Sequence, residues 1–219
     1  MPQLFPPSSN RFARISIIVT ALVIVMLVGG LVAYTHSAKF TKVGQAISQP
    51  VPFPHKFHIT QLGLNCRYCH ASVDQSSFAD LPPAETCMSC HSQIALEVDS
   101  LQPIRDSYRK GVPVMWNRVN DLPDYVYFDH QIHVTKGVGC ETCHGRMDQV
   151  NTAVRYKYFY MTTCTECHKY PEKYLRPQEN IYDMGYEPAQ DQTTLGMELV
   201  QQNKLLPSSQ LTNCSICHR

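Results

Sequence analysis

Residues 128–144 read FDHQIHVTKGVGCETCH and contain the two patterns that decide the fold of this chain. The stretch ends in Cys140-Glu-Thr-Cys143-His144, a C-x-x-C-H motif, and begins with a phrase of the form F-x-H-x-x-H. C-x-x-C-H is the attachment signature of c-type haem, in which two thiols form thioethers to one porphyrin and the histidine becomes the proximal ligand of the iron. The stretch therefore predicts a covalent haem site.

Four more copies of the motif occur in the 219 residues, so that every one of the ten cysteines belongs to a C-x-x-C-H motif. The sequence therefore predicts five covalently bound haem c groups and five proximal histidines. The additional copies are Cys66-Arg-Tyr-Cys69-His70, Cys87-Met-Ser-Cys90-His91, Cys164-Thr-Glu-Cys167-His168 and Cys214-Ser-Ile-Cys217-His218.

Two other uses of paired cysteines explain the pattern less well. Zinc ribbons use C-x-x-C pairs two at a time, so five pairs leave one unmatched, and the constant histidine has no role in them. Five thioredoxin-like disulfide elements in one small domain would need strand-helix-strand patterning that this sequence lacks. Haem attachment accounts for all fifteen motif residues at once.

The phrase F-x-H-x-x-H occurs twice, at 53–58 and 128–133, and each copy precedes two haem motifs. This makes an internal repeat of 53–91 and 128–168. Histidines three residues apart lie on one side of a helical turn, so each phrase can offer imidazoles to two irons. We expect four six-coordinate, low-spin irons, and leave open which histidine serves which iron. Taken singly, each of these residues would be an ordinary surface or core histidine, but the repetition favours distal ligands at His55, His58, His130 and His133.

The fifth haem lacks a spare histidine, because His36 ends an apolar segment and is expected to be interfacial. Methionine is the usual substitute, and His/Met ligation raises the reduction potential relative to two histidines. Met161, three residues before Cys164, is the preferred candidate. Most methionines simply pack in cores, and the alternatives here are Met147, Met184 and Met197.

Residues 15–35 run for 21 residues without a charge, which is about the 30 Å needed to cross a bilayer core. The alternative is a cleaved signal peptide, but the apolar part of such a peptide spans only ~7–15 residues and precedes an A-x-A site. Arg11 and Arg14 before the segment predict a cytoplasmic N-terminus. The expected order is a short cytoplasmic segment (1–14), a transmembrane helix (15–35), a linker (36–52) and a pentahaem domain (53–219) whose fifth haem is attached at 214–218. The haem domain then lies on the periplasmic side of a bacterial inner membrane, where haem c is attached.

Composition sets the expected fold class. The formal net charge of +1 gives no indication of nucleic-acid binding, although six bases and no acids precede Asp74. About 35 residues per haem are too few to build a separate apolar core around each porphyrin, so the haems must form the core. We expect a mainly helical and irregular multihaem cytochrome c with short motif-bearing helices. The stretches 101–127 and 169–192 are expected to be mostly loop, with a helix near 193–204.

Six-coordinate irons leave no open position for a substrate, so the predicted domain is an electron carrier rather than an enzyme acting alone. A haem-based gas sensor would need a vacant iron. One apolar helix also forms no enclosed quinol pocket, which suggests that any quinol reacts in a partner protein.

The phrases at 53–70, 115–146 and 211–219 resemble the pentahaem cytochrome c subunits (ActA) of alternative complex III, and the likeness covers the apolar segment and nearly all of the haem domain. The resemblance implies an electron-transfer subunit of a membrane-bound quinol:electron-acceptor oxidoreductase. The implied partners are iron-sulfur and polytopic quinol-binding subunits as donors, and a monohaem cytochrome c subunit or soluble carrier as acceptor. It also implies the ligand set given above for the four bis-histidine haems.

An alternative is a self-contained, membrane-anchored quinol dehydrogenase similar to the NapC/NrfH cytochromes. Those proteins usually carry four haems with motifs close to the helix, whereas Cys66 follows Thr35 by about thirty residues.

Overall fold

The computed structural model describes residues 5–6 and 8–218. Part of the predicted N-terminal segment (1–4 and 7) and Arg219, at the end of the predicted haem domain, lie outside the described residues. The chain divides into two compact units, Met1–Val43 and Gly44–Arg219.

The first unit contains helix α1 (Ser8–Thr35) and the short helix α2 (Ala38–Thr41). At 28 residues, α1 is about 42 Å long. Within the described part of the chain it is the one helix long and apolar enough to cross a membrane, although a signal sequence has the same properties. It begins before the uncharged segment, because Arg11 and Arg14 continue the helix toward Ser8.

In the second unit, the cysteines of all five C-x-x-C-H motifs lie on short helices, as their spacing predicts, whereas His70 and His218 follow the last residue of their helices. A helical turn places cysteines at i and i+3 and histidine at i+4 on one face. Asn65 and Asn213 cap two of these helices by accepting hydrogen bonds from the backbone N–H of Arg67 and Ser215. The motif helices are α3 (Cys66–Cys69), α4 (Ala84–His91), α7 (Cys140–His144), α8 (Met161–Lys169) and α11 (Cys214–Cys217).

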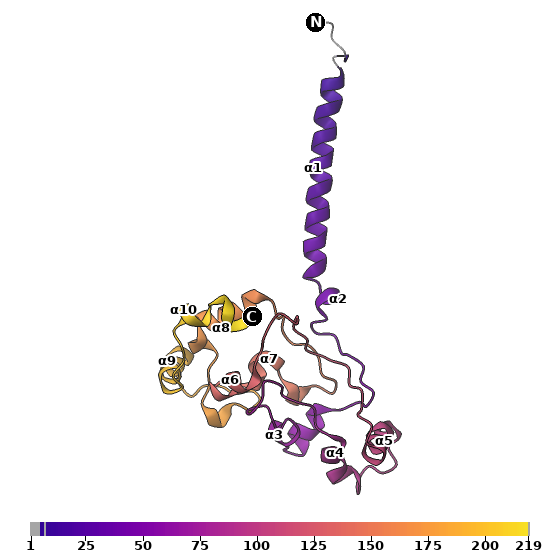
Figure 1. Cartoon of the computed structure of the whole chain (residues 1–219), viewed down its shortest axis with the longest axis vertical. Helices are drawn as coiled ribbons and strands as arrows, with labels where there is room; N and C mark the ends of the chain where they lie inside the picture. The colour runs from indigo at the N-terminus through magenta and orange to yellow at the C-terminus, as the bar shows by residue number, and fades with distance from the viewer. Residues whose placement is uncertain (1–4, 7, 219) are drawn as a thin grey trace. The chain divides into compact units, whose positions relative to one another are not determined.

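The described residues contain no β-strand, only isolated bridges that join Ala46 to Val154 and Val138 to Leu175. The mainly helical and irregular fold class is therefore confirmed (Figure 1). The remaining helices are α5 (Gln102–Lys110), α6 (His130–Thr135), α9 (Gln192–Gln202) and α10 (Ser208–Leu211), with short η segments at Phe57–Gln61, Asp99–Leu101, Met147–Gln149, Pro171–Lys173 and Gln178–Asn180.

Helix α9 confirms the helix predicted near 193–204, and Asp191 caps it by accepting hydrogen bonds from Thr194. The stretch 101–127 is mostly loop, as expected, although it begins with helix α5, which was not predicted. Only Ile104 and Arg105 of this nine-residue helix are buried, so it is too short and too polar to stand out, although its residues do follow the helical period. Gly111 ends it with a left-handed φ of 66°.

The second half of the predicted 36–52 linker is packed into the second unit. The Gly44 N–H donates to the Arg155 carbonyl at 2.8 Å, and the Gln49 amide exchanges two hydrogen bonds with the backbone of Asn117. Val51 is only 1% exposed. These contacts make 44–52 a structural part of the haem domain.

The hydrophobic core formed by the protein's own side chains is small. The described residues bury only seven apolar side chains, and the cluster at the centre of the second unit consists of Val73, Val134 and Ile181. A domain of roughly 150 residues normally buries about 70% of its unfolded surface. The remaining apolar surface in this unit is therefore available to bound groups.

Candidate haem-binding sites

We number the candidate sites 1 to 5 after their motifs in chain order, with proximal histidines His70, His91, His144, His168 and His218. None of the ten cysteines forms a disulfide, and each is at least partly exposed. Among the described residues, no three His, Cys, Asp or Glu side chains gather as a metal ion would require. The histidines instead come together in pairs.

Three of the predicted distal histidines each lie opposite a proximal histidine, and the distance between ring centroids is nearly the same in all three pairs. The ring centroids are 6.4 Å apart for His58 and His91, 6.4 Å for His130 and His144, and 6.2 Å for His133 and His168. The angles between the ring planes are 58°, 8° and 27° in the same order. These pairs involve sites 2, 3 and 4.

The spacing fits one iron between two imidazoles. An imidazole nitrogen binds a metal at about 2.0 Å, and the ring centroid lies about 1.1 Å behind that nitrogen. Two axial imidazoles therefore place their centroids about 6.2 Å apart. The observed spacing is therefore compatible with one six-coordinate haem iron bound between the two imidazoles.

At site 1, His55 lies in the electrostatic neighbourhood of His70. Burial is the main reason that the pKa of His55 falls to about 4, and the nearby His70, His58 and His144 lower it further. Burial likewise lowers the pKa of His144 to about 4, again assisted by its neighbouring histidines. Both imidazoles are therefore neutral at pH 7, the form that binds iron.

Backbone carbonyls select the tautomer of six of these histidines. Their Nδ1–H groups donate to carbonyl oxygens at 2.6–3.1 Å, which leaves Nε2 with its lone pair free for a metal. The pairs are His58 with Pro54, His70 with Asp80, His130 with Ser77, His133 with Asp129, His168 with Leu211 and His218 with Tyr125.

The phenylalanine of each F-x-H-x-x-H phrase orients both histidines of that phrase. Phe53 lies edge-on to His55 (4.8 Å, 88°) and stacks on His58 (4.2 Å, 28°). Phe128 repeats this arrangement with His130 (4.8 Å, 89°) and His133 (4.5 Å, 24°). The repeat in the sequence is thus also a repeat in side-chain geometry, which explains why the phrase begins with Phe.

Asn120 is a functional candidate that the sequence did not reveal. Its Nδ2 lies 3.2 Å from Nδ1 of His144, while its Oδ1 is buried without a partner. Nδ1 of His144 must carry the proton if Nε2 binds iron, and turning the amide by half a turn lets Oδ1 accept a hydrogen bond from this Nδ1–H. We assign this orientation. No sequence motif marks Asn120, because it acts across 24 residues of chain.

Within the described part of the chain, site 5 has no paired histidine. Cys214 is exposed, and the described histidines include no ring paired with His218. Met161 starts α8 with its side chain 69% exposed, one helical turn before Cys164. Cys164 in turn lies in the electrostatic neighbourhood of Cys217. Met161 lies one helical turn from Cys164 and stays a candidate ligand of site 5.

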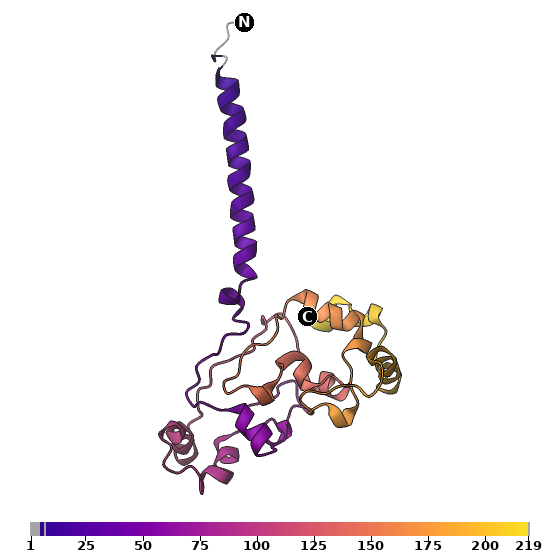
Figure 2. The same cartoon turned by 180° about the vertical axis from the view of Figure 1, so that it is seen from behind.

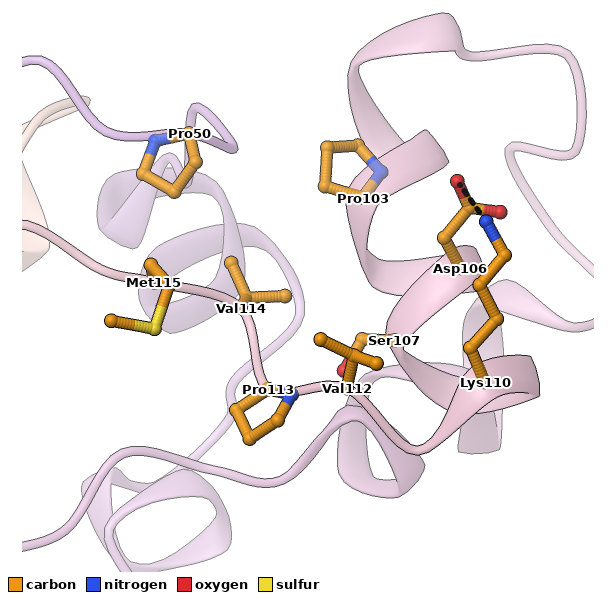
Figure 3. Close-up of a pocket in the computed structure, with 9 residues that line it drawn as sticks. All are labelled: Pro50, Pro103, Asp106, Ser107, Lys110, Val112, Pro113, Val114 and Met115. Carbon is orange, nitrogen blue, oxygen red and sulfur yellow. Dashed lines mark ion pairs between the residues drawn. The ribbon is translucent and has the colours of Figure 1, made fainter.

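The other methionine candidates and His36 lie elsewhere. Met147 belongs to the η segment after site 3, and Met197 is on α9. His36 follows α1, and its Nδ1 contacts the carbonyl of Val32 at 2.9 Å. A separate groove of about 340 Å³ beside α5 is lined by Pro50, Pro103, Val112–Met115 and the ion pair of Asp106 with Lys110 (Figure 3). No motif cysteine or histidine lines this groove.

Comparison with known proteins agrees with this geometry. Residues 126–219, which contain sites 3, 4 and 5, match the family model for cytochrome c7 and related cytochrome c. The chain contains a multihaem cytochrome c domain. The cytochrome family implies covalently bound haem c, which the paired imidazoles and the motif helices described above fit.

A relative of the cytochrome domain is the menaquinone reductase, multihaem cytochrome c subunit of Nitratidesulfovibrio vulgaris (strain Hildenborough). The two sequences are 33% identical over 97 residues, which cover 44% of this chain and 45% of the relative. The chain thus matches less than half of the relative's length.

Proposed function

We propose that this chain is a membrane-anchored pentahaem cytochrome c that conducts electrons within a quinone-linked respiratory complex. The observation that carries the proposal is the recurring 6.2–6.4 Å spacing of paired imidazoles. Irons held between two histidines are saturated, so the chain's residues exclude substrates and favour outer-sphere electron exchange. When bound, each haem would supply reversible one-electron redox chemistry.

The proposed ligands follow from the pairs. Each cysteine pair attaches one haem, His55 and His58 serve sites 1 and 2, and His130 and His133 serve sites 3 and 4. Met161 is the proposed sixth ligand at site 5. The first histidine of each phrase thus pairs with the first motif of its repeat, and the second histidine pairs with the second motif.

Helix α1 is the proposed anchor, with 1–14 on the cytoplasmic side and the haem domain on the periplasmic side of a bacterial inner membrane. The apolar length of α1 and the arginines at its start support this topology. Cell fractionation and protease protection of spheroplasts test it: a haem domain that is released without detergent would contradict the anchor.

Two features support a quinone-linked complex. The sequence resembles the pentahaem subunits of alternative complex III, and the relative is named as a subunit of a menaquinone reductase. We assign the chain to an alternative complex III, where iron-sulfur and polytopic membrane subunits oxidise quinol and a monohaem cytochrome or soluble carrier accepts the electrons. The name of the relative favours the reverse direction as a second candidate, with electrons passing through the chain toward menaquinone.

Purification in mild detergent tests the assignment. We expect five haems per chain by intact mass and by pyridine haemochrome absorbance, together with copurifying iron-sulfur and polytopic subunits. A chain that isolates alone and is reduced directly by a quinol analogue would instead support the self-contained NapC/NrfH-like dehydrogenase. Turnover of the intact complex with quinol plus oxidised carrier, and with quinone plus reduced carrier, decides the direction.

A further inference from the structure

Sites 1 and 2 adjoin each other in the structure. Tyr68, between the cysteines of site 1, shares a hydrogen bond of 2.9 Å with Ser89, between the cysteines of site 2. The distal histidines of these two sites, His55 and His58, also contact one phenylalanine, Phe53. The two motif helices therefore form one contiguous pair.

Site 1 also adjoins site 3, although site 2 lies between them in the sequence. The Cys140 N–H donates to the Ile181 carbonyl at 3.1 Å, and Cys66 Sγ lies 3.9 Å from the next carbonyl oxygen, that of Tyr182. The loop after site 1 supports the distal ligand of site 3, because His130 Nδ1–H donates to Ser77 at 3.0 Å. Two independent segments thus join sites 1 and 3.

Site 3 continues to site 4, and site 4 to site 5. Helix α6 supplies the distal histidines of both sites 3 and 4, one turn apart. His168 of site 4 donates to the carbonyl of Leu211 at 2.7 Å, just before the site 5 motif, and Ser208 Oγ donates to Lys169 at 2.9 Å. Helices α8 and α10 pack together through these contacts.

Site 2 has a different kind of neighbour on its far side. Its helix α4 packs against α5, which carries neither cysteine nor histidine. Figures 1 and 2 agree that, within the second unit, α4 and α5 lie at one end, α6 and α7 in the middle, and α8 and α10 at the other end. Site 2 is therefore a terminus of the arrangement.

We infer that the five attachment sites form one unbranched series in the spatial order 2–1–3–4–5, with site 2 and site 5 as its ends. The inference rests on the proposed function, since it requires haem at each site. In this series, electrons enter or leave at the motif helices of the two end sites, α4 and α11. Site 1 comes first along the chain but lies between sites 2 and 3 in space.

Two matched variants test the order in the full-length holoprotein. His55→Met and His58→Met change the distal ligand of sites 1 and 2 by the same substitution, three residues apart. A unit charge about 12 Å away at an effective dielectric of about 20 changes an equilibrium about tenfold. The substitution changes the potential at which one haem gains an electron, and so changes its charge while its neighbours titrate. The reduction equilibria of adjacent haems therefore change about tenfold, and those of more distant haems change much less.

The series 2–1–3–4–5 predicts that His58→Met displaces one other haem in a spectrally resolved redox titration and that His55→Met displaces two. A series in chain order would give the reverse, one haem for His55→Met and two for His58→Met, and that result would overturn the inference. If either variant fails to mature, the anomalous scattering of iron from crystals of the unaltered chain decides the order.

The haem content separates the two levels of the argument. Five haems per chain in any other order would refute only the series. A chain that matures with fewer than five haems would contradict the proposed pentahaem function itself.

Discussion

Replacing Asn120 tests whether its side chain tunes the iron at site 3. In Asn120→Asp, a carboxylate takes the place of the amide oxygen next to Nδ1 of His144, where the present distance is 3.2 Å. Adding the path of about 4 Å from Nδ1 through the imidazole to the iron gives a charge-to-iron distance of about 7 Å. At an effective dielectric of about 20 the interaction is about 2.4 kcal/mol. Because the negative charge stabilises ferric iron, the potential of this haem should fall by about 100 mV.

Asn120→Ala should move the same haem in the opposite direction. The variant removes a hydrogen bond worth about 1 kcal/mol that makes the imidazole a better electron donor, so the potential should rise by about 40 mV. Asn117→Asp is the matched control, since it adds the same charge three residues away on an exposed side chain that bonds to Ser48. Solvent and salt screen that charge, so we expect a much smaller shift.

The assay is a potentiometric titration followed by optical and EPR spectra that resolve the individual haems. Near-native visible spectra and a full haem count establish that each variant is folded. Shifts of equal sign in Asn120→Asp and Asn120→Ala, or no shift in either folded variant, would refute the assigned amide orientation.

Three further predictions concern other parts of the molecule. Met161→Ala should abolish the methionine-iron charge-transfer band and lower the highest of the five reduction potentials. Met197→Ala, which changes another exposed methionine (54%), should leave the band and the potential unchanged. A band that persists in Met161→Ala would exclude Met161 as a ligand. The EPR spectrum should resolve a larger maximum g value for site 2, whose imidazole planes are 58° apart, than for site 3, whose planes are 8° apart, because rotating the ligand planes reduces the splitting of the iron d orbitals. Gly196→Ala should lower the free energy of unfolding by about 2 kcal/mol, because the added Cβ would collide with the Glu172 carbonyl where α9 packs on Pro171–Lys173. Thermal melting measures the loss, and Thr193→Ala, at an exposed position of the same helix, is the control.

The sequence by itself determined the local chemistry. C-x-x-C-H spacing decides which residues share a helical face, so five motif helices and the helix near 193–204 followed from local geometry. The repeated F-x-H-x-x-H phrase likewise marked four spare histidines, because two imidazoles on one turn need no distant contact to lie together. Helix α5 was not predicted within the expected loop stretch, because nine mostly polar residues that bury only Ile104 and Arg105 are too few to sustain a helical period.

Only the tertiary structure decided which histidine faces which, since the partners are separated by up to 35 residues and meet through chain folding. The same holds for the carbonyls that select tautomers and for Asn120 behind His144. The spatial order of the sites also depends on long-range packing: the carbonyls of Ile181 and Tyr182 bring Cys140 beside Cys66. A sequence motif specifies what can bind at a site, whereas the arrangement of sites depends on contacts between segments distant in the chain.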